Sequence, residues 1–341
     1  MVTAAIGGTC VCTWSNRLQR PALRAAAEPA RWTSGLLDWG SILGSEYSGF
    51  KEIQQGIDAF VAYLESKGVS ISAQSRFASA VERGRQVVAS WETRVIPEGF
   101  DTHTYLADFA NLWWISSLIM RVKGTELEES LIPRLNLLTK ADPLPLTSGV
   151  ASIERNTFFE VIVACICSLF ASNVQFDDPD VVCCYGGARW GIACKVVYGS
   201  NRETAKDVRK ARKQIENSDV DFGLIAVQTT NRFPHERMYT VDWTTGDISS
   251  FHNEASQRVL FMKNLVALTT AIERETIKNL KIHRREWSSK ARGIIFLAST
   301  VAYFRARRVI MGGCVFSPFS WLRATPEYAF VEKMNQYWQK L

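Results

Sequence analysis

The chain has 341 residues, of which 47% are apolar and 22% charged, a balance typical of a soluble globular protein with a substantial core. The net charge of +6 belongs to the second half: residues 1–150 carry 14 basic and 15 acidic side chains, whereas residues 151–341 carry 26 and 19. We therefore expect a polyanionic partner for the C-terminal half, although this excess is modest beside a dedicated nucleic-acid-binding domain.

Cysteine usage argues against both zinc and disulfides. The eight cysteines form no CxxC pair, lie mostly in apolar runs and are accompanied by only four histidines. Free thiols of this kind are typical of a reducing compartment, and no segment resembles a secretory signal peptide, so we expect a cytoplasmic protein. The apolar runs Phe109–Met120 and Phe158–Phe170 are shorter than the roughly 20 residues of a membrane-spanning helix. Both are expected as buried helices, with no membrane association.

The first half predicts a helical region behind an arm. Residues 1–35 contain four arginines and one acid without periodicity, which predicts a poorly ordered arm. From residue 48 to residue 140, apolar residues recur at spacings of three and four, which predicts about four helices. The prolines, serine and glycine of Ala141–Gly149 indicate a linker. We therefore expect an arm (1–35), an all-helical N-terminal domain (36–148) and a second domain (149–341).

The second half mixes helical and strand patterns. A buried helix at Thr157–Ser172 precedes strands at Val174–Tyr185 and Arg189–Tyr198, a charged helix at Ser200–Asn217 and a strand at Phe222–Thr229. A long helix (Ser256–Arg285), a strand (Gly293–Phe304) and a terminal helix (Glu327–Leu341) follow. This order is typical of an α/β (α+β) fold in which helices pack on a mixed sheet.

A hairpin is predicted at Gly186-Gly187, because a pair of glycines supplies the positive φ angles of a two-residue turn. With these glycines as the loop, Tyr185 pairs with Ala188. The same register, continued along both strands, places Asp180 opposite Ala193.

This register also brings Lys195 into the same neighbourhood. Side chains two residues apart on a strand share a face, so Ala193 and Lys195 point the same way, beside Asp180. An acid and a lysine on adjacent strands, together with a second acid, can hold Mg²⁺ and place an ammonium next to a water or a phosphate. These are the requirements for hydrolysing a phosphodiester.

The order of these features resembles the PD-(D/E)xK nuclease superfamily, whose members share the restriction-endonuclease-like fold. The resemblance covers Arg155–Gln228. Its five parts, in the family's order, are the helix FFEVIVA with Glu160, Pro179-Asp180, the strand ending Ala193-Cys194-Lys195, a helix with Gln214, and the apolar strand GLIAV.

The resemblance implies a role for each matched residue. Asp180 would be the main metal ligand, Lys195 the catalytic lysine and Glu160 an auxiliary ligand from the first helix. The backbone carbonyl of Cys194 would be a further ligand, and Gln214 matches a position that supports the site or the substrate. The implied cofactor is Mg²⁺ (or Mn²⁺), and the implied substrate is nucleic acid, with DNA favoured over RNA.

Ala193 departs from the family, which usually has Asp or Glu there, and leaves the metal one carboxylate short. Two acids could compensate: Glu160, or Asp178 if the strand is extended from there to Asp180. Glu203 has a simpler role, because Ser200-x-x-Glu203 fits a capping box at the start of a helix.

The helix at Ser200–Asn217 offers a surface for nucleic acid. Its basic residues fall largely outside the apolar face and could contact phosphates, although a merely solvated face is an equal alternative. They are Lys206, Arg209, Lys210 and Lys213. Two further basic clusters follow in the same half: Lys278, Lys281, Arg284 and Arg285, then Arg305, Arg307 and Arg308.

Three functions are consistent with these patterns. The first is a Mg²⁺-dependent nuclease with Glu160, Asp180 and Lys195 in its active site. The second is a catalytically degenerate protein of the same fold that binds nucleic acid or a partner protein. The third is an adaptor that forms homo-oligomers through the apolar helix around Trp113-Trp114.

Overall fold

The computed structural model describes residues 50–93, 102–140, 153–197, 201–230, 289–304, 308–316 and 324–339, with residues 271, 274 and 278. Within these residues lie seven helices and six strands. Four helices come first, as predicted: α2 (Phe50–Ser66), α3 (Arg76–Thr93), α4 (Thr102–Val122) and α5 (Leu127–Leu138). The remaining helices are α6 (Ile153–Ser168), α7 (Asn201–Asn217) and α10 (Pro326–Gln339). The strands are β1 (Ser172–Gln175), β2 (Val181–Tyr185), β3 (Ala188–Val196), β4 (Phe222–Gln228), β5 (Ala291–Phe304) and β6 (Arg308–Phe316).

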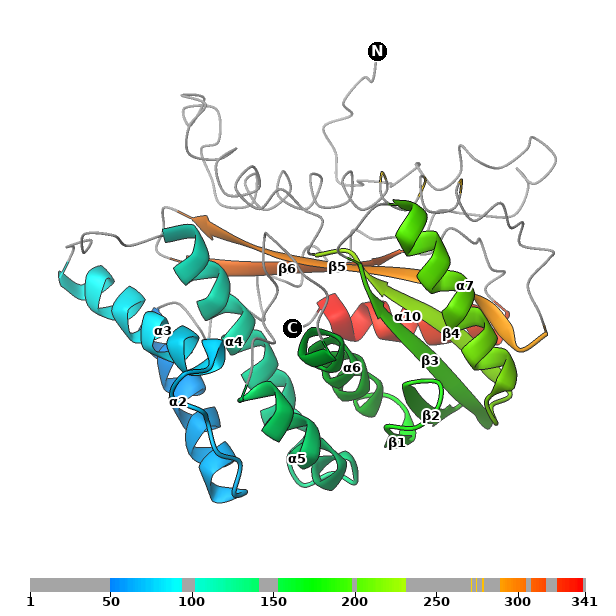
Figure 1. Ribbon diagram of the computed structural model, residues 1–341, viewed down its shortest axis with the longest axis horizontal. Helices are drawn as coiled ribbons and strands as arrows, with labels where there is room; N and C mark the ends of the chain where they lie inside the picture. The colour runs from blue at the N-terminus through cyan, green and yellow to red at the C-terminus, as the bar shows by residue number, and fades with distance from the viewer. Residues whose placement is uncertain are drawn as a thin grey trace, which may run out of the picture.

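The six strands form one mixed sheet in the order β1-β2-β3-β4-β5-β6. Strands β3, β4 and β5 run parallel, and the other neighbouring pairs are antiparallel. Helix α7 covers one face of the sheet, and α6 and α10 cover the other (Figure 1). The predicted combination of a mixed sheet with flanking helices is thereby confirmed.

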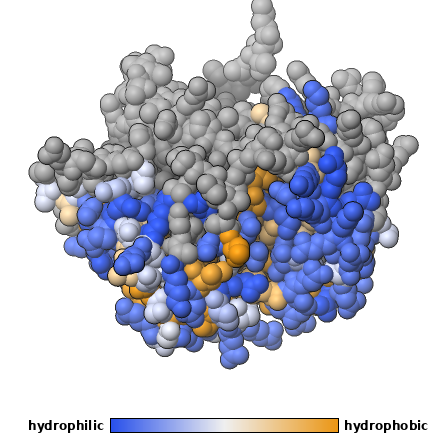
Figure 2. Space-filling view, viewed as in Figure 1, coloured by the Kyte–Doolittle hydropathy of each residue, from blue (hydrophilic) through white to orange (hydrophobic). Residues whose placement is uncertain are grey.

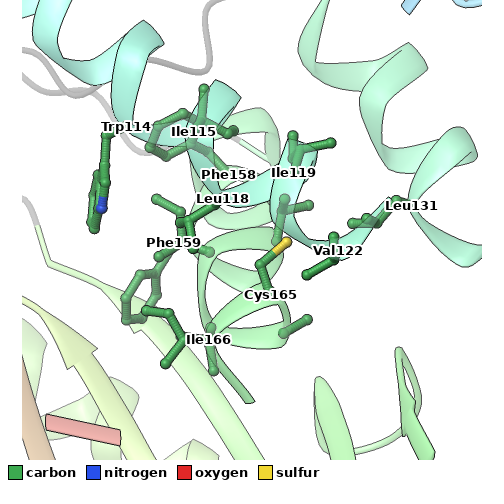
Figure 3. Packing of buried hydrophobic residues seen from close by; sticks show 14 of the residues in the cluster. Trp114, Ile115, Leu118, Ile119, Val122, Leu131, Phe158, Phe159, Cys165 and Ile166 are labelled. Carbon is green, nitrogen blue, oxygen red and sulfur yellow. The ribbon is translucent and has the colours of Figure 1, made fainter. Parts of the chain in front are cut away.

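Helix α6 is the centre of the core. From Thr157 to Cys167 every residue except Glu160 is buried. A helix that is apolar on all sides must be covered on all sides. The sheet covers one side of α6, and α4 and α5 cover the other, where Phe158 and Cys165 lie among side chains of α4 (Figure 3). Burial of one such aromatic or aliphatic side chain stabilises the fold by roughly 1.5–3 kcal/mol.

The N-terminal helices and the sheet share one apolar core. Buried residues on both sides of the predicted domain boundary at 148/149 belong to a single cluster, while the boundary itself lies outside the described residues, as does the predicted arm. Trp113 and Trp114 are buried in this cluster. Their own chain covers both side chains, and an oligomer formed through the N-terminal helical region stays a prediction.

Several element boundaries differ from the predictions. The strand predicted at Val174–Tyr185 is two strands, β1 and β2, separated by a turn. Strand β6 was not predicted, and it contains Arg308 of the third basic cluster. The helix predicted at Ser256–Arg285 lies outside the described residues except for positions 271, 274 and 278, which are helical.

Five cysteines and seven helices among the described residues bear on thiol state and on membrane-spanning segments. The five cysteines at 165, 167, 183, 184 and 194 are free thiols. Across the described parts of the chain, no helix combines the length and the apolar character that crossing a membrane requires. The cytoplasmic location stays a prediction.

A buried carboxylate joins α2 to α5. The Glu128 Oε1 atom accepts a hydrogen bond of 2.9 Å from the Tyr63 hydroxyl and lies 2.7 Å from Lys67 Nζ. Its Oε2 atom accepts a hydrogen bond of 2.5 Å from the Gly124 N–H. The bonds from Lys67, Gly124 and Tyr63, in that order of importance, lower the pKa of Glu128 from 4.5 to about 2.

We predict that Glu128→Gln destabilises the protein at neutral pH and lowers Tm by about 3–8 °C, because charge-assisted hydrogen bonds are lost. A lowered pKa in the folded state stabilises the protein above pH 4.5, and this contribution is lost as the pH falls toward 2. Thermal melts from pH 7 to pH 3 should therefore show the Tm difference shrinking on acidification. Glu65→Gln, an exposed position on α2, is the control. A difference that stays constant with pH contradicts this account.

Candidate functional site

The β2–β3 hairpin has the predicted register. It turns at Gly186 and Gly187, whose φ angles of +60° and +79° favour glycine. Tyr185 pairs with Ala188, and the ladder continues to Val181 opposite Ile192. Because β2 begins at Val181, β3 extends beyond its partner.

Asp180 lies immediately before β2, at the point where the pairing of β2 with β3 ends. Its Oδ2 atom accepts a hydrogen bond of 2.6 Å from the Cys194 N–H, so a side-chain carboxylate replaces a backbone partner of β3. The N–H and C=O of one strand residue face the same neighbouring strand. The Cys194 carbonyl should therefore face the same edge as Asp180.

Two further predicted residues meet at this carboxylate. Lys195 Nζ lies 3.1 Å from Asp180 Oδ2, and Gln214 Nε2 donates to Asp180 Oδ1 over 3.1 Å. Lys195 Nζ also donates to Gln214 Oε1 at 3.4 Å, and Gln214 Nε2 donates to the Pro179 carbonyl. The Asp180 and Lys195 side chains are 17% and 24% exposed. The structure thus joins β2, β3 and α7 in one polar network that solvent can reach.

Two glycines allow this close approach. A Cβ atom at Gly191 would lie 2.8 Å from Pro179 Cδ, so the absence of a side chain lets Pro179 pack against β3 beside Asp180. A Cβ atom at Gly223 on β4 would collide with Ile215 on α7, the residue after Gln214. Both glycines therefore help to fix the position of the network.

Glu160 faces the site from α6. Its side chain is 18% exposed, and its Oε2 atom lies 3.7 Å from Arg134 Nη2. Burial raises the pKa of Glu160, the nearby Asp180 carboxylate raises it further, and Arg134 and Lys195 oppose this rise. Among the described residues, the Glu160 carboxylate forms this ion pair with Arg134 and accepts no hydrogen bond.

Arg134 is a site residue that sequence reasoning missed. It lies on α5, and its guanidinium carbon is 3.7 Å from the centre of the Phe176 ring. Its charge interacts with Glu160 and Asp180. A single arginine within LEESLIPRLNLL carries no signal that could have placed it here. With Arg134 included, the site holds two acids and two cations.

Asp178 and Ala193 have different surroundings from those expected. Asp178 is exposed and lies in a turn, with a cis peptide bond to Pro179, so the expectation of an extended strand from Asp178 to Asp180 is wrong. Ala193 is 0% exposed and packs in the apolar cluster between the sheet and α7. Glu160 is therefore the acid that the structure brings near Asp180.

The basic residues predicted to contact nucleic acid are exposed on α7. Lys206, Arg209, Lys210 and Lys213 all face solvent, and the surface over α7, on the right of Figure 2, is hydrophilic. Lys210 lies 4.0 Å from Asp207 in an exposed ion pair. Outside the described residues lie Ser200 and five basic residues: Lys281, Arg284, Arg285, Arg305 and Arg307. The Glu203 side chain is likewise outside them, so the capping box stays a prediction.

The site offers oxygen atoms, which are the type of ligand that Mg²⁺ prefers. Across the described ranges no three His, Cys, Asp or Glu side chains gather in a way that could hold a metal ion. The available set is the carboxylates of Asp180 and Glu160 and the Cys194 carbonyl. Mg²⁺ is commonly bound through one or two carboxylates while it keeps several waters. A Glu160 carboxylate that accepts no hydrogen bond from the described residues suits such a ligand, so the donor set fits a hydrated Mg²⁺.

Comparisons with known proteins give no identification. The chain matches no family model, and no curated protein or solved structure is significantly similar to it.

We predict that Ala193→Glu lowers Tm by at least about 5 °C without metal, because it buries an unpaired carboxylate. If the new side chain reaches the site, Mg²⁺ or Mn²⁺ should raise Tm more in this variant than in the wild type. Differential scanning fluorimetry with increasing metal measures both effects. Ala193→Gln, which has the same size and no charge, should respond to metal like the wild type. An equal metal response in all three proteins shows that a carboxylate at position 193 does not reach a metal at the site.

Proposed function

We propose that the chain is a Mg²⁺-dependent nuclease of the restriction-endonuclease-like fold that hydrolyses phosphodiester bonds, with DNA favoured over RNA. The observation that carries this proposal is the Asp180 carboxylate, bonded to both Lys195 and Gln214 where β2 pairing ends. The succession α6, β1, β2, β3, α7 and β4, with β3 and β4 parallel, supports the same assignment.

The residues of the site can divide the work of hydrolysis. Asp180 and Glu160 would hold Mg²⁺, which, when bound, supplies an activated water and a polarised phosphate oxygen. The Lys195 ammonium offsets the negative charge that develops on the phosphate oxygens. Gln214 accepts a hydrogen bond from Lys195 and donates one to Asp180, so it holds the cation and the carboxylate in a fixed relation.

The surface charge of α7 supports binding of a polyanion next to this site. Lys206, Lys210 and Lys213 are exposed on the helix that also carries Gln214. Such side chains contact the sugar-phosphate backbone and carry no sequence preference of their own.

We expect the purified protein to cleave nucleic acid in the presence of Mg²⁺ or Mn²⁺, tested on labelled single-stranded DNA, double-stranded DNA and RNA. Lys195→Ala and Asp180→Asn should each reduce the cleavage rate by at least about 100-fold, because the first removes the cation that offsets charge on the reacting phosphate and the second removes a charged ligand of the proposed metal. Lys333→Ala, an exposed lysine on α10, is the control and should retain most activity. Cleavage that persists in both site variants rules out this assignment.

A degenerate nuclease fold that binds nucleic acid without cutting is the second candidate. It is favoured by the buried Ala193 and by Arg134 and Lys195, which balance the two carboxylates without a metal. In this case, no metal supports cleavage, yet binding remains sensitive to salt.

Both candidates predict that α7 contributes to the salt dependence of binding. Replacement of Lys206, Lys210 and Lys213 by Gln should reduce the slope of log K against log salt concentration by about 2–3, since each phosphate contact contributes roughly 0.9. Fluorescence anisotropy over a salt series measures this slope, and Lys333→Gln on α10 is an exposed control. An unchanged slope in the triple variant excludes α7 from the binding surface.

A further inference from the structure

Arg134 is the charged residue of the site that the proposed roles leave unused. It belongs to α5, whereas Asp180, Lys195, Glu160 and Gln214 come from α6 and the elements after it. Helix α5 packs on α6 and so carries Arg134 to Glu160. The helical N-terminal region thereby contributes a cation to a site that is otherwise built by the second half of the chain.

A structural ion pair does not account for the Arg134 side chain. A guanidinium has five N–H donors in a planar fork. In the described part of the chain, the Nε atom of Arg134 is buried without a hydrogen-bond partner. The Nη2 atom lies 3.7 Å from Glu160 Oε2, which is longer than a hydrogen bond. The guanidinium is therefore held near the carboxylate without a hydrogen bond to it, and its Nε atom has no partner among the described residues.

Phe176 packs against the guanidinium of Arg134. The guanidinium carbon lies 3.7 Å from the ring centre, a cation–π contact of the kind that arginine commonly makes with aromatic rings. Phe176 precedes the turn that leads to Asp180, so the segment that positions the carboxylate also positions the arginine. A guanidinium that is already held against a ring binds a phosphate with less loss of conformational freedom than a fully mobile one.

We propose that Arg134 binds a phosphate of the nucleic acid backbone at the site, beside the phosphate that Lys195 faces. Arginine binds phosphate through two parallel N–H···O bonds, whereas the Lys195 ammonium acts as a point charge. Arg134 is then the residue that holds the strand in position while Asp180, Glu160 and Lys195 act on it. This inference rests on the proposed function insofar as the ligand is nucleic acid, but it does not require cleavage.

The test is equilibrium binding of a fluorescein-labelled single-stranded or double-stranded DNA oligonucleotide in EDTA, where cleavage does not interfere. Arg134→Gln should weaken binding about 5–30-fold and reduce the salt slope by about 1. Arg134→Lys keeps the counter-ion of Glu160 and loses the planar fork, and it should weaken binding to an intermediate degree. Arg121→Gln, an exposed arginine at the end of α4, should bind like the wild type.

Each outcome either supports the inference or overturns it. If Arg134→Gln and Arg134→Lys both bind like the wild type, or if the wild type itself does not bind, Arg134 contacts no phosphate. A lower Tm with unchanged binding makes Arg134 a structural counter-ion of Glu160. If Arg134→Gln does not fold, the Arg134→Lys result decides. If binding depends on Arg134 but no metal supports cleavage, the nuclease is refuted and this inference remains intact. If the protein cleaves nucleic acid but binds it independently of Arg134, the nuclease remains intact and this inference is refuted.

Discussion

The burial of α6 on every side is the constraint on which the rest of the structure depends. One sheet face covers only half of such a helix, so α4 and α5 must cover the remainder. Between Thr157 and Cys167, the only residue that is not buried is Glu160. A carboxylate at this point of an apolar helix requires charged or polar neighbours. The packing of α6 therefore determines where the polar site lies and which helix supplies Arg134.

Asp180 connects this core to the opposite face of the sheet. Its carboxylate takes the place of a backbone partner for Cys194, and it is also bonded to Lys195 and to Gln214 of α7. Few side-chain torsions remain free in a network of this kind, because each group is held by at least two others. The site gains its rigidity from strand pairing and helix packing, as functional sites on regular elements generally do.

The sequence predicted the parts of the site that depend on local rules. The Gly186-Gly187 turn fixes the register of one hairpin, and that register alone places Asp180 near Lys195. Parts that depend on non-local packing or on local departures from a pattern were missed. Arg134 reaches the site only because α5 folds over α6. The turn at Asp178 interrupts a run whose residues read as one strand. An apolar helix such as α4 does not reveal whether its own chain or a second copy buries it.

The contribution of α5 to the site has a consequence for the order of synthesis. A chain leaves the ribosome from its N-terminus, at about 5–20 residues per second. About 30 residues separate the end of α5 from the end of α6. Synthesis of these residues takes roughly 1.5–6 s, and until then the apolar side of α4 and α5 lacks the helix that covers it. During this interval the nascent chain exposes a surface that molecular chaperones recognise. Arg134 is synthesised before any carboxylate of the site, and the network closes only when α7 has emerged and folded.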